Sequence, residues 1–68
     1  MSIFVFKTKL EGEEVTAHLL YVSDPTGVYN SEIVKVIYEN HDVVKILAEE
    51  TLYELDGIGL YHLDKQDD

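Results

Sequence analysis

A two-residue period in side-chain character runs through the first 22 residues. From Ile3 to Leu10, and again from Val15 to Val22, every second side chain would lie on the same side of an extended chain. That period is typical of β-strands. The residues between the two runs include Gly12, which can adopt the positive φ of a tight turn. The sequence therefore predicts an antiparallel hairpin at the N-terminus.

A second turn signal follows the hairpin. Asp24-Pro25-Thr26-Gly27 fits a type I turn, because proline sets φ at the second position and aspartate can bond the backbone beyond it. With its neighbours, this motif predicts a loop over residues 23–30, the longest in the chain.

The stretch from Ile33 to Leu47 fits two structures. At 100° per residue the apolar side chains of residues 33–38 gather on one side, which favours a short amphipathic helix after Asn30 or Ser31. However, seven of the residues between positions 33 and 46 are Val or Ile, which favour strands. In that second interpretation residues 33–38 pair with residues 43–47 around a turn at 39–42.

The C-terminal third is also open to two interpretations. Residues 48–55 are helix formers that Gly57 could terminate, whereas Asp56-Gly57 is a strong signal for a two-residue hairpin turn. Both interpretations place a final strand at residues 58–63. The polar residues 64–68 predict a frayed tail.

Together these patterns predict a single small domain over residues 1–68, of α+β class. It would contain an N-terminal antiparallel β-hairpin, one short central helix and one or more C-terminal strands. The alternative is a small five-stranded β-barrel, which is loosely similar to SH3-like barrels in strand count alone. A chain of this length buries only about 60% of its unfolded surface. We therefore expect some apolar surface to face a partner or a second copy.

Composition excludes several classes of protein. There is no cysteine, so neither a disulfide framework nor a thiolate zinc site can form. The apolar runs are far shorter than the roughly 20 residues that span a bilayer, and Lys7 and Lys9 interrupt the first run, unlike a signal peptide. We expect a cytoplasmic protein that does not bind membranes. Five lysines and no arginine cannot form the basic stripe that direct nucleic-acid binding requires.

Acidic residues are the strongest functional signal. The chain carries 14 Asp and Glu against 5 Lys, a formal net charge of −9, and the acids fall into two clusters. Acids can simply keep a small protein soluble, but tyrosines beside them are typical of interfaces. Tyr21, Tyr38 and Tyr61 are expected in the core. The predicted partner-binding residues are Glu11, Glu13 and Glu14 of the first cluster, Glu49, Glu50, Glu54 and Asp56 of the second, and Tyr29 and Tyr53.

Catalytic and metal sites have little support in the sequence. His62 and Asp64 would share a strand face and could form a metal or acid/base pair, although an ordinary histidine explains the pattern better. Gly57 and Gly59 form only a bare G-x-G, without the rest of a phosphate loop. We predict no catalytic residue, no metal and no cofactor.

These observations favour a non-enzymatic protein-binding module. It would occlude or regulate a larger macromolecule with a basic surface, and in size and charge it is analogous to a phage-type inhibitor or a nucleic-acid mimic. The alternative is a small homodimeric structural or assembly module that buries its apolar surplus at its own interface.

Overall fold

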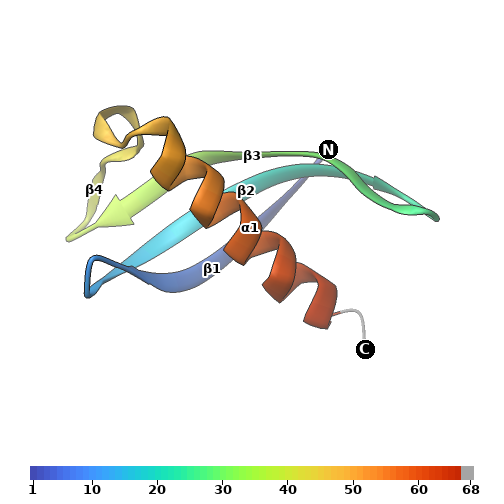
Figure 1. The fold of residues 1–68 in the computed structure, drawn as a ribbon, viewed down its shortest axis with the longest axis horizontal. Helices are drawn as coiled ribbons and strands as arrows, with labels where there is room; N and C mark the ends of the chain where they lie inside the picture. Colours follow the sequence, from blue (N-terminus) through green and yellow to red (C-terminus); the bar gives the residue numbers. More distant parts are fainter. Residues whose placement is uncertain (67–68) are drawn as a thin grey trace.

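A computed structural model describes residues 1–66, apart from the side chains of Tyr29 and Gln66. The elements follow in the order β1 (Ser2–Leu10), β2 (Glu13–Asp24), β3 (Gly27–Tyr38), β4 (His41–Asp42), the 3-10 helix η1 (Val44–Ile46) and α1 (Glu49–Gln66). The strands form one antiparallel sheet in the order β1-β2-β3-β4. Helix α1 crosses one face of this sheet and leaves the other face open (Figure 1).

The α+β class and the N-terminal hairpin are confirmed. The first turn has two residues, Glu11 and Gly12, between the paired Leu10 and Glu13. Both turn residues have positive φ, 51° and 84°, as a type I′ hairpin turn requires. The turn from β3 to β4 repeats this geometry with φ of 48° and 68° at residues 39 and 40.

The turn at Asp24–Gly27 is also confirmed, but the loop around it is shorter than predicted. Strands β2 and β3 continue to Asp24 and Gly27, leaving only two residues between them. Asp24 Oδ1 accepts hydrogen bonds from the Thr26 backbone N–H, at 2.8 Å, and from the Thr26 hydroxyl. The hydroxyl bond first, and then the backbone bond, hold the pKa of Asp24 below its usual value.

Of the two structures that residues 33–38 fit, the short helix is wrong and the strand is confirmed, because this segment belongs to β3. The physical reason is a register shift between β2 and β3: His18 pairs with Lys35, whereas Leu19 pairs with Ile33, so Val34 is the extra residue of a β-bulge. Consequently Ile33 and Val36, three positions apart, are both buried. That spacing imitates the period of a helix.

The predicted strand at residues 58–63 is wrong as well, because α1 occupies this segment. Residues 48–55 do lead into a helix, but it continues through Gly57 to Gln66. The first part of the predicted frayed tail is therefore helical, and residues 67–68 lie outside the described residues. The helix forms despite the Asp56-Gly57 turn signal because a helical spacing places Leu55 and Gly59 against the sheet, where both are buried.

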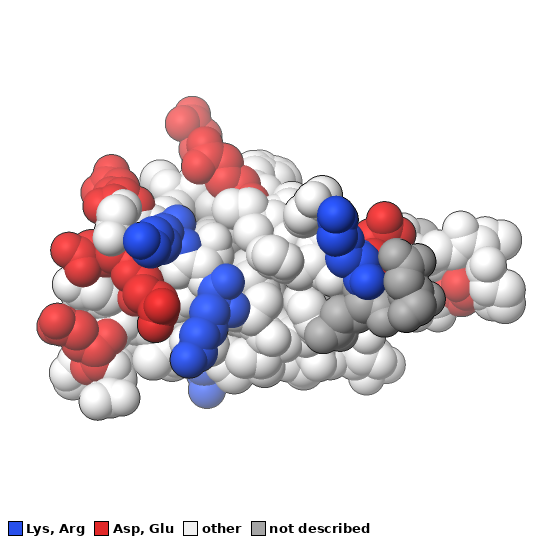
Figure 2. All heavy atoms as spheres, turned by 90° about the horizontal axis from the view of Figure 1, so that it is seen from below, with Lys and Arg blue, Asp and Glu red and all other residues white. Residues whose placement is uncertain are grey.

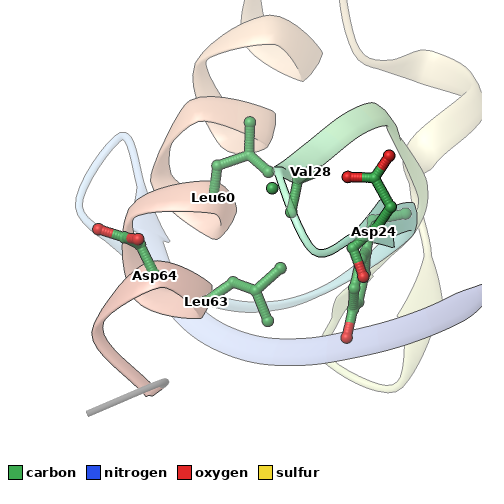
Figure 3. Close-up of a pocket in the computed structure, with 8 residues that line it drawn as sticks. Asp24, Val28, Leu60, Leu63 and Asp64 are labelled. Atoms are coloured by element: carbon green, nitrogen blue, oxygen red, sulfur yellow. The ribbon is translucent and has the colours of Figure 1, made fainter.

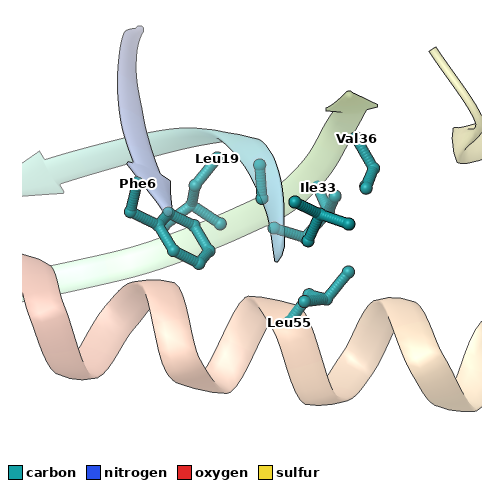
Figure 4. Packing of buried hydrophobic residues seen from close by; sticks show 7 residues of the cluster. Phe6, Leu19, Ile33, Val36 and Leu55 are labelled. Carbon is teal, nitrogen blue, oxygen red and sulfur yellow. The ribbon is translucent and has the colours of Figure 1, made fainter. Parts of the chain in front are cut away.

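The core lies between α1 and the covered face of the sheet. Figure 4 shows the strand side chains directed at the helix and Leu55 directed back at them. The buried apolar side chains are Phe6, Val15, Ala17, Leu19, Ile33, Val36 and Leu55.

Gly59 allows the helix to approach this closely. A Cβ atom at this position would lie 2.7 Å from Phe6 Cε1 and 3.2 Å from Leu19 Cδ2. No comparable constraint applies at Gly57, where a Cβ would meet nothing within 4 Å.

The five-stranded barrel alternative does not form. The sheet has four strands, β1 and β4 are its edges, and the helix covers one face instead of a closing strand. The strand proposed over residues 43–47 is replaced by the two-residue β4 and by η1. This irregular segment matters for the site, because it forms one wall of a groove.

Candidate functional site: an apolar groove with acidic residues at its side

Most of the turns of the molecule lie at one end. The β1–β2 turn, the β3–β4 turn, η1 and the start of α1 are all found there, to the left in Figure 1. Figure 2 shows acidic side chains gathered at that same end, while lysines occupy the middle of the visible face. On this face of the molecule the acidic side chains are therefore unevenly distributed.

A groove of about 430 Å³ opens at this acidic end. Its floor is apolar and includes Val15, which is 3% exposed, while Ile46 on η1 is 82% exposed at its side. An isoleucine that exposed is unusual beside a hollow with an apolar floor, because the hydrophobic effect favours covering both. The lining residues are Leu10, Glu11, Glu13, Val15, Tyr38, Val43, Ile46 and Leu47.

The acidic residues act electrostatically on the groove. The nearby carboxylates of Glu13 and then Glu39 raise the pKa of Tyr38, because a phenolate there would be repelled by both. Partial burial of the phenol and a hydrogen bond with Glu13 shift it in the same direction. The groove thus combines apolar walls with a negative potential, which suits an apolar side chain that has a cation beside it.

Hydrogen bonds fix the wall that η1 forms. Asp42 Oδ1 accepts bonds from the backbone N–H of Val44, at 3.1 Å, and of Val36, at 3.3 Å. The Val43 N–H donates to the Val36 carbonyl at 2.8 Å. The Val44 bond is the main cause of the lowered pKa of Asp42, and the Val36 bond and the charges of Lys35 and Lys45 also lower it. The carboxylate therefore ties η1 to β3.

The structure separates the three acids predicted in the first turn. Glu11 and Glu13 line the groove. Glu14 lies on the opposite face of the sheet, directly across from Lys9 of β1. A cross-strand pair of opposite charges is mildly stabilising. Glu14 therefore has a local structural partner and does not contribute to the groove.

The predicted residues of the second cluster lie on α1, outside the groove. Glu50, Tyr53 and Glu54 form an exposed stripe, and the Tyr53 side chain is 76% exposed. Glu49 lines a separate hollow of about 140 Å³ with Leu52 and Tyr53. Asp56 is half-buried, and its Oδ1 has no hydrogen-bond partner among the described residues.

Sequence reasoning missed part of the groove and could not place one residue. Tyr38 and Tyr61 were expected in the core, yet Tyr38 is half-buried at the groove and Tyr61 is 59% exposed on α1. Val43, Ile46 and Leu47 belonged to a strand in one of the two interpretations of residues 33–47, and no signal marked them as a wall. The side chain of Tyr29 lies outside those that the structure describes.

A second groove, of about 400 Å³, lies at the opposite end between α1 and the β2–β3 hairpin. Figure 3 shows Val28, Leu60 and Leu63 directed into it, while the Asp64 carboxylate points away. Asp24 also lines it, and its Oδ1 accepts two hydrogen bonds from Thr26. The lining of this groove is more polar than that of the first.

The prediction that His62 and Asp64 share a face is wrong. Both residues lie on α1, and side chains two positions apart on a helix point about 200° apart. The His62 ring instead lies 5.9 Å from the ring of Phe6. Among the described residues, no group of three or more His, Asp or Glu side chains is placed to hold a metal ion.

Within the described part of the chain, α1 included, no helix has the length and apolar character to cross a membrane.

Comparison with protein-family models, with curated proteins and with solved structures found no match to this chain.

Proposed function

We propose that this protein is a non-enzymatic binding module whose groove receives a cationic, partly apolar segment of a larger macromolecule. The observation that carries the proposal is the groove itself, in which Glu11 and Glu13 lie beside an apolar floor and the exposed Ile46. A lysine or arginine next to a leucine-sized side chain matches both features.

The two features contribute differently to binding. Burying one aliphatic side chain contributes about 1.5–3 kcal/mol, whereas an exposed ion pair contributes about 0–1 kcal/mol. Affinity would therefore come chiefly from the apolar floor. The acids would speed association and select basic partners, and both effects would weaken as salt is added.

Occlusion is the mode of action that suits this size. A standard interface buries about 800 Å² on each partner, roughly one sixth of the 5120 Å² that this chain exposes. Binding through the acidic end would cover a basic surface of the partner and compete with phosphate groups for it. A role as a phage-type inhibitor or nucleic-acid mimic in the cytoplasm is the specific form of this proposal.

A synthetic decapeptide of alternating lysine and leucine is a suitable probe. We expect Glu11→Gln with Glu13→Gln to weaken binding at least fivefold at low salt and to flatten its salt dependence, because two carboxylates are lost from the groove. Glu32→Gln is the control for the loss of one carboxylate outside the groove, since Glu32 is exposed on β3 and does not line the groove. Equal affinities for the double variant and the control, measured by calorimetry, would contradict the proposal.

A triple variant distinguishes the groove from the helix stripe. Replacing Glu49, Glu50 and Glu54 by Gln removes three charges from α1 but leaves the groove lining intact. We expect a smaller effect than that of the groove variant. A larger effect would move the site to the exposed stripe around Tyr53.

A further inference from the structure

The chain exposes more surface than a monomer of its mass usually does. A folded monomer of 7.8 kDa is expected to expose about 4,400 Å², whereas this chain exposes 5120 Å². The excess of about 700 Å² is close to the roughly 800 Å² that each partner buries in a standard interface. The extra exposed area is therefore about as large as the area that one chain buries in a standard interface.

The surplus includes apolar side chains along the edge strand β1. Ile3 and Val5 are each 51% exposed on the open face of the sheet, and Met1 is 94% exposed just before the strand. Within residues 1–66 no strand pairs with the outer edge of β1. A long, apolar, unpaired edge favours pairing with another strand.

We propose that two copies of this chain pair through β1, antiparallel and centred on Phe4, to form a continuous eight-stranded sheet. In this register Phe4 lies opposite Phe4 of the other copy, and Ile3 lies opposite Val5. The apolar N-terminal half of β1 in one copy therefore pairs with the same half of β1 in the other copy. This proposal goes beyond the groove function and does not depend on it.

Charge disfavours two other registers, and centring on Val5 or Phe6 would place Lys7 opposite Ile3 or Val5 instead of pairing apolar side chains. Pairing centred on Lys7 would place two lysines directly opposite each other, and pairing centred on Thr8 would place Lys7 opposite Lys9. Like charges directly opposite are destabilising. Centring on Phe4 places no lysine opposite another lysine: Lys7 lies opposite Met1, and Lys9 lies beyond the paired segment.

The same register keeps the two acidic ends apart. Glu11 lies seven residues from Phe4, about 23 Å along a strand, so the two first turns would be separated by about 45 Å. This is several times the Debye length of about 8 Å at physiological salt. The dimer therefore avoids strong repulsion although each chain carries a net charge of −9, and both grooves stay accessible.

The helix side of β1 also has room for a second copy. A hollow of about 350 Å³ runs along the strand and is lined by Phe4, Val5, Phe6, Lys7, His62 and Lys65. The Phe4 ring is half-buried there and stacks on Phe6 at 5.8 Å. Across the two-fold axis, the two Phe4 rings would cover each other.

Sedimentation velocity on the full chain, at concentrations up to about 200 μM, tests the proposal. We expect the native chain to dimerise, and Val5→Lys to raise the dissociation constant at least tenfold. Val34→Lys is the control on the same open face: Val34 is 37% exposed and lies on β3, which β2 separates from the proposed β1 edge. We expect it to change the dissociation constant less than twofold, with circular dichroism confirming that both variants fold.

Two outcomes would overturn the proposal. One is a native chain that stays monomeric at the highest concentration. The other is equal disruption by Val5→Lys and Val34→Lys, which would mean that the open faces stack instead of the edges pairing.

Cysteine variants test the register independently, because the native chain has no cysteine. In the proposed register Ile3→Cys of one copy meets Val5→Cys of the other. We expect an equimolar mixture of the two variants to form the mixed disulfide at least fivefold more than either self-disulfide under mild oxidation. Self-disulfides that equal or exceed the mixed product would overturn the register.

Discussion

The two glycines of α1 give opposite predictions for the same substitution. At Gly57 an added Cβ meets nothing within 4 Å, so Gly57→Ala should stabilise the protein by about 1 kcal/mol through helix propensity alone. At Gly59 the same gain is opposed by overpacking, since the Cβ would lie 2.7 Å and 3.0 Å from two carbons of the Phe6 ring and 3.2 Å from Leu19. Overpacking of this kind costs about 1–3 kcal/mol.

Comparing the two variants isolates the packing contribution, because the propensity gain is common to both. With about 2 kcal/mol for overpacking, Gly59→Ala should melt roughly 8–16 °C below Gly57→Ala in a domain of this size. Thermal unfolding followed by circular dichroism at 222 nm measures this difference. Equal stabilisation by both substitutions would contradict this prediction, because it would mean that α1 does not lie against β1 and β2 at Gly59.

Three further substitutions test other parts of the fold. Leu55→Ala empties the middle of the core, where Leu55 is 1% exposed, and should cost about 2–5 kcal/mol in urea unfolding. Gly12→Ala should cost about 1 kcal/mol in the same assay, because alanine is strained at a φ of 84°. The Asp42 carboxylate has a pKa below its usual 3.8, so its stabilising effect is present above about pH 4 and is lost as the pH falls through the lowered value. Asp42→Asn keeps an oxygen that can accept these hydrogen bonds but has no carboxyl group to protonate. We therefore expect the variant to lose less stability than the native chain as the pH is lowered, as acid unfolding profiles would show.

The sequence predicts the first half of the fold well where local chemistry and tertiary structure agree. The alternating pattern over residues 3–22, together with Gly12 in the turn, predicts the first hairpin correctly. Asp24 and Gly27 likewise mark the second turn.

The errors arise where long-range pairing overrides a local pattern. The bulge at Val34 depends on the register between β2 and β3, which no residue of β3 reveals by itself. The Asp56-Gly57 turn signal is overridden because the helix covers the sheet with Leu55 and fits Gly59 against Phe6.

The candidate site was only partly predictable for a related reason. Glu11 and Glu13 stand out in the sequence as acids in a turn. Their apolar neighbours, such as Ile46, become a groove wall only when Asp42 ties η1 to β3. Charge is visible in composition, but a concave surface exists only after distant segments meet.

Chemical-shift mapping with the lysine–leucine peptide tests whether the groove is the binding site. We expect the largest amide shifts on the groove, at Glu13, Tyr38, Val43 and Ile46, and saturation with a single dissociation constant. Shifts concentrated instead along α1 near Tyr53, or spread evenly over all exposed acids, would contradict this expectation.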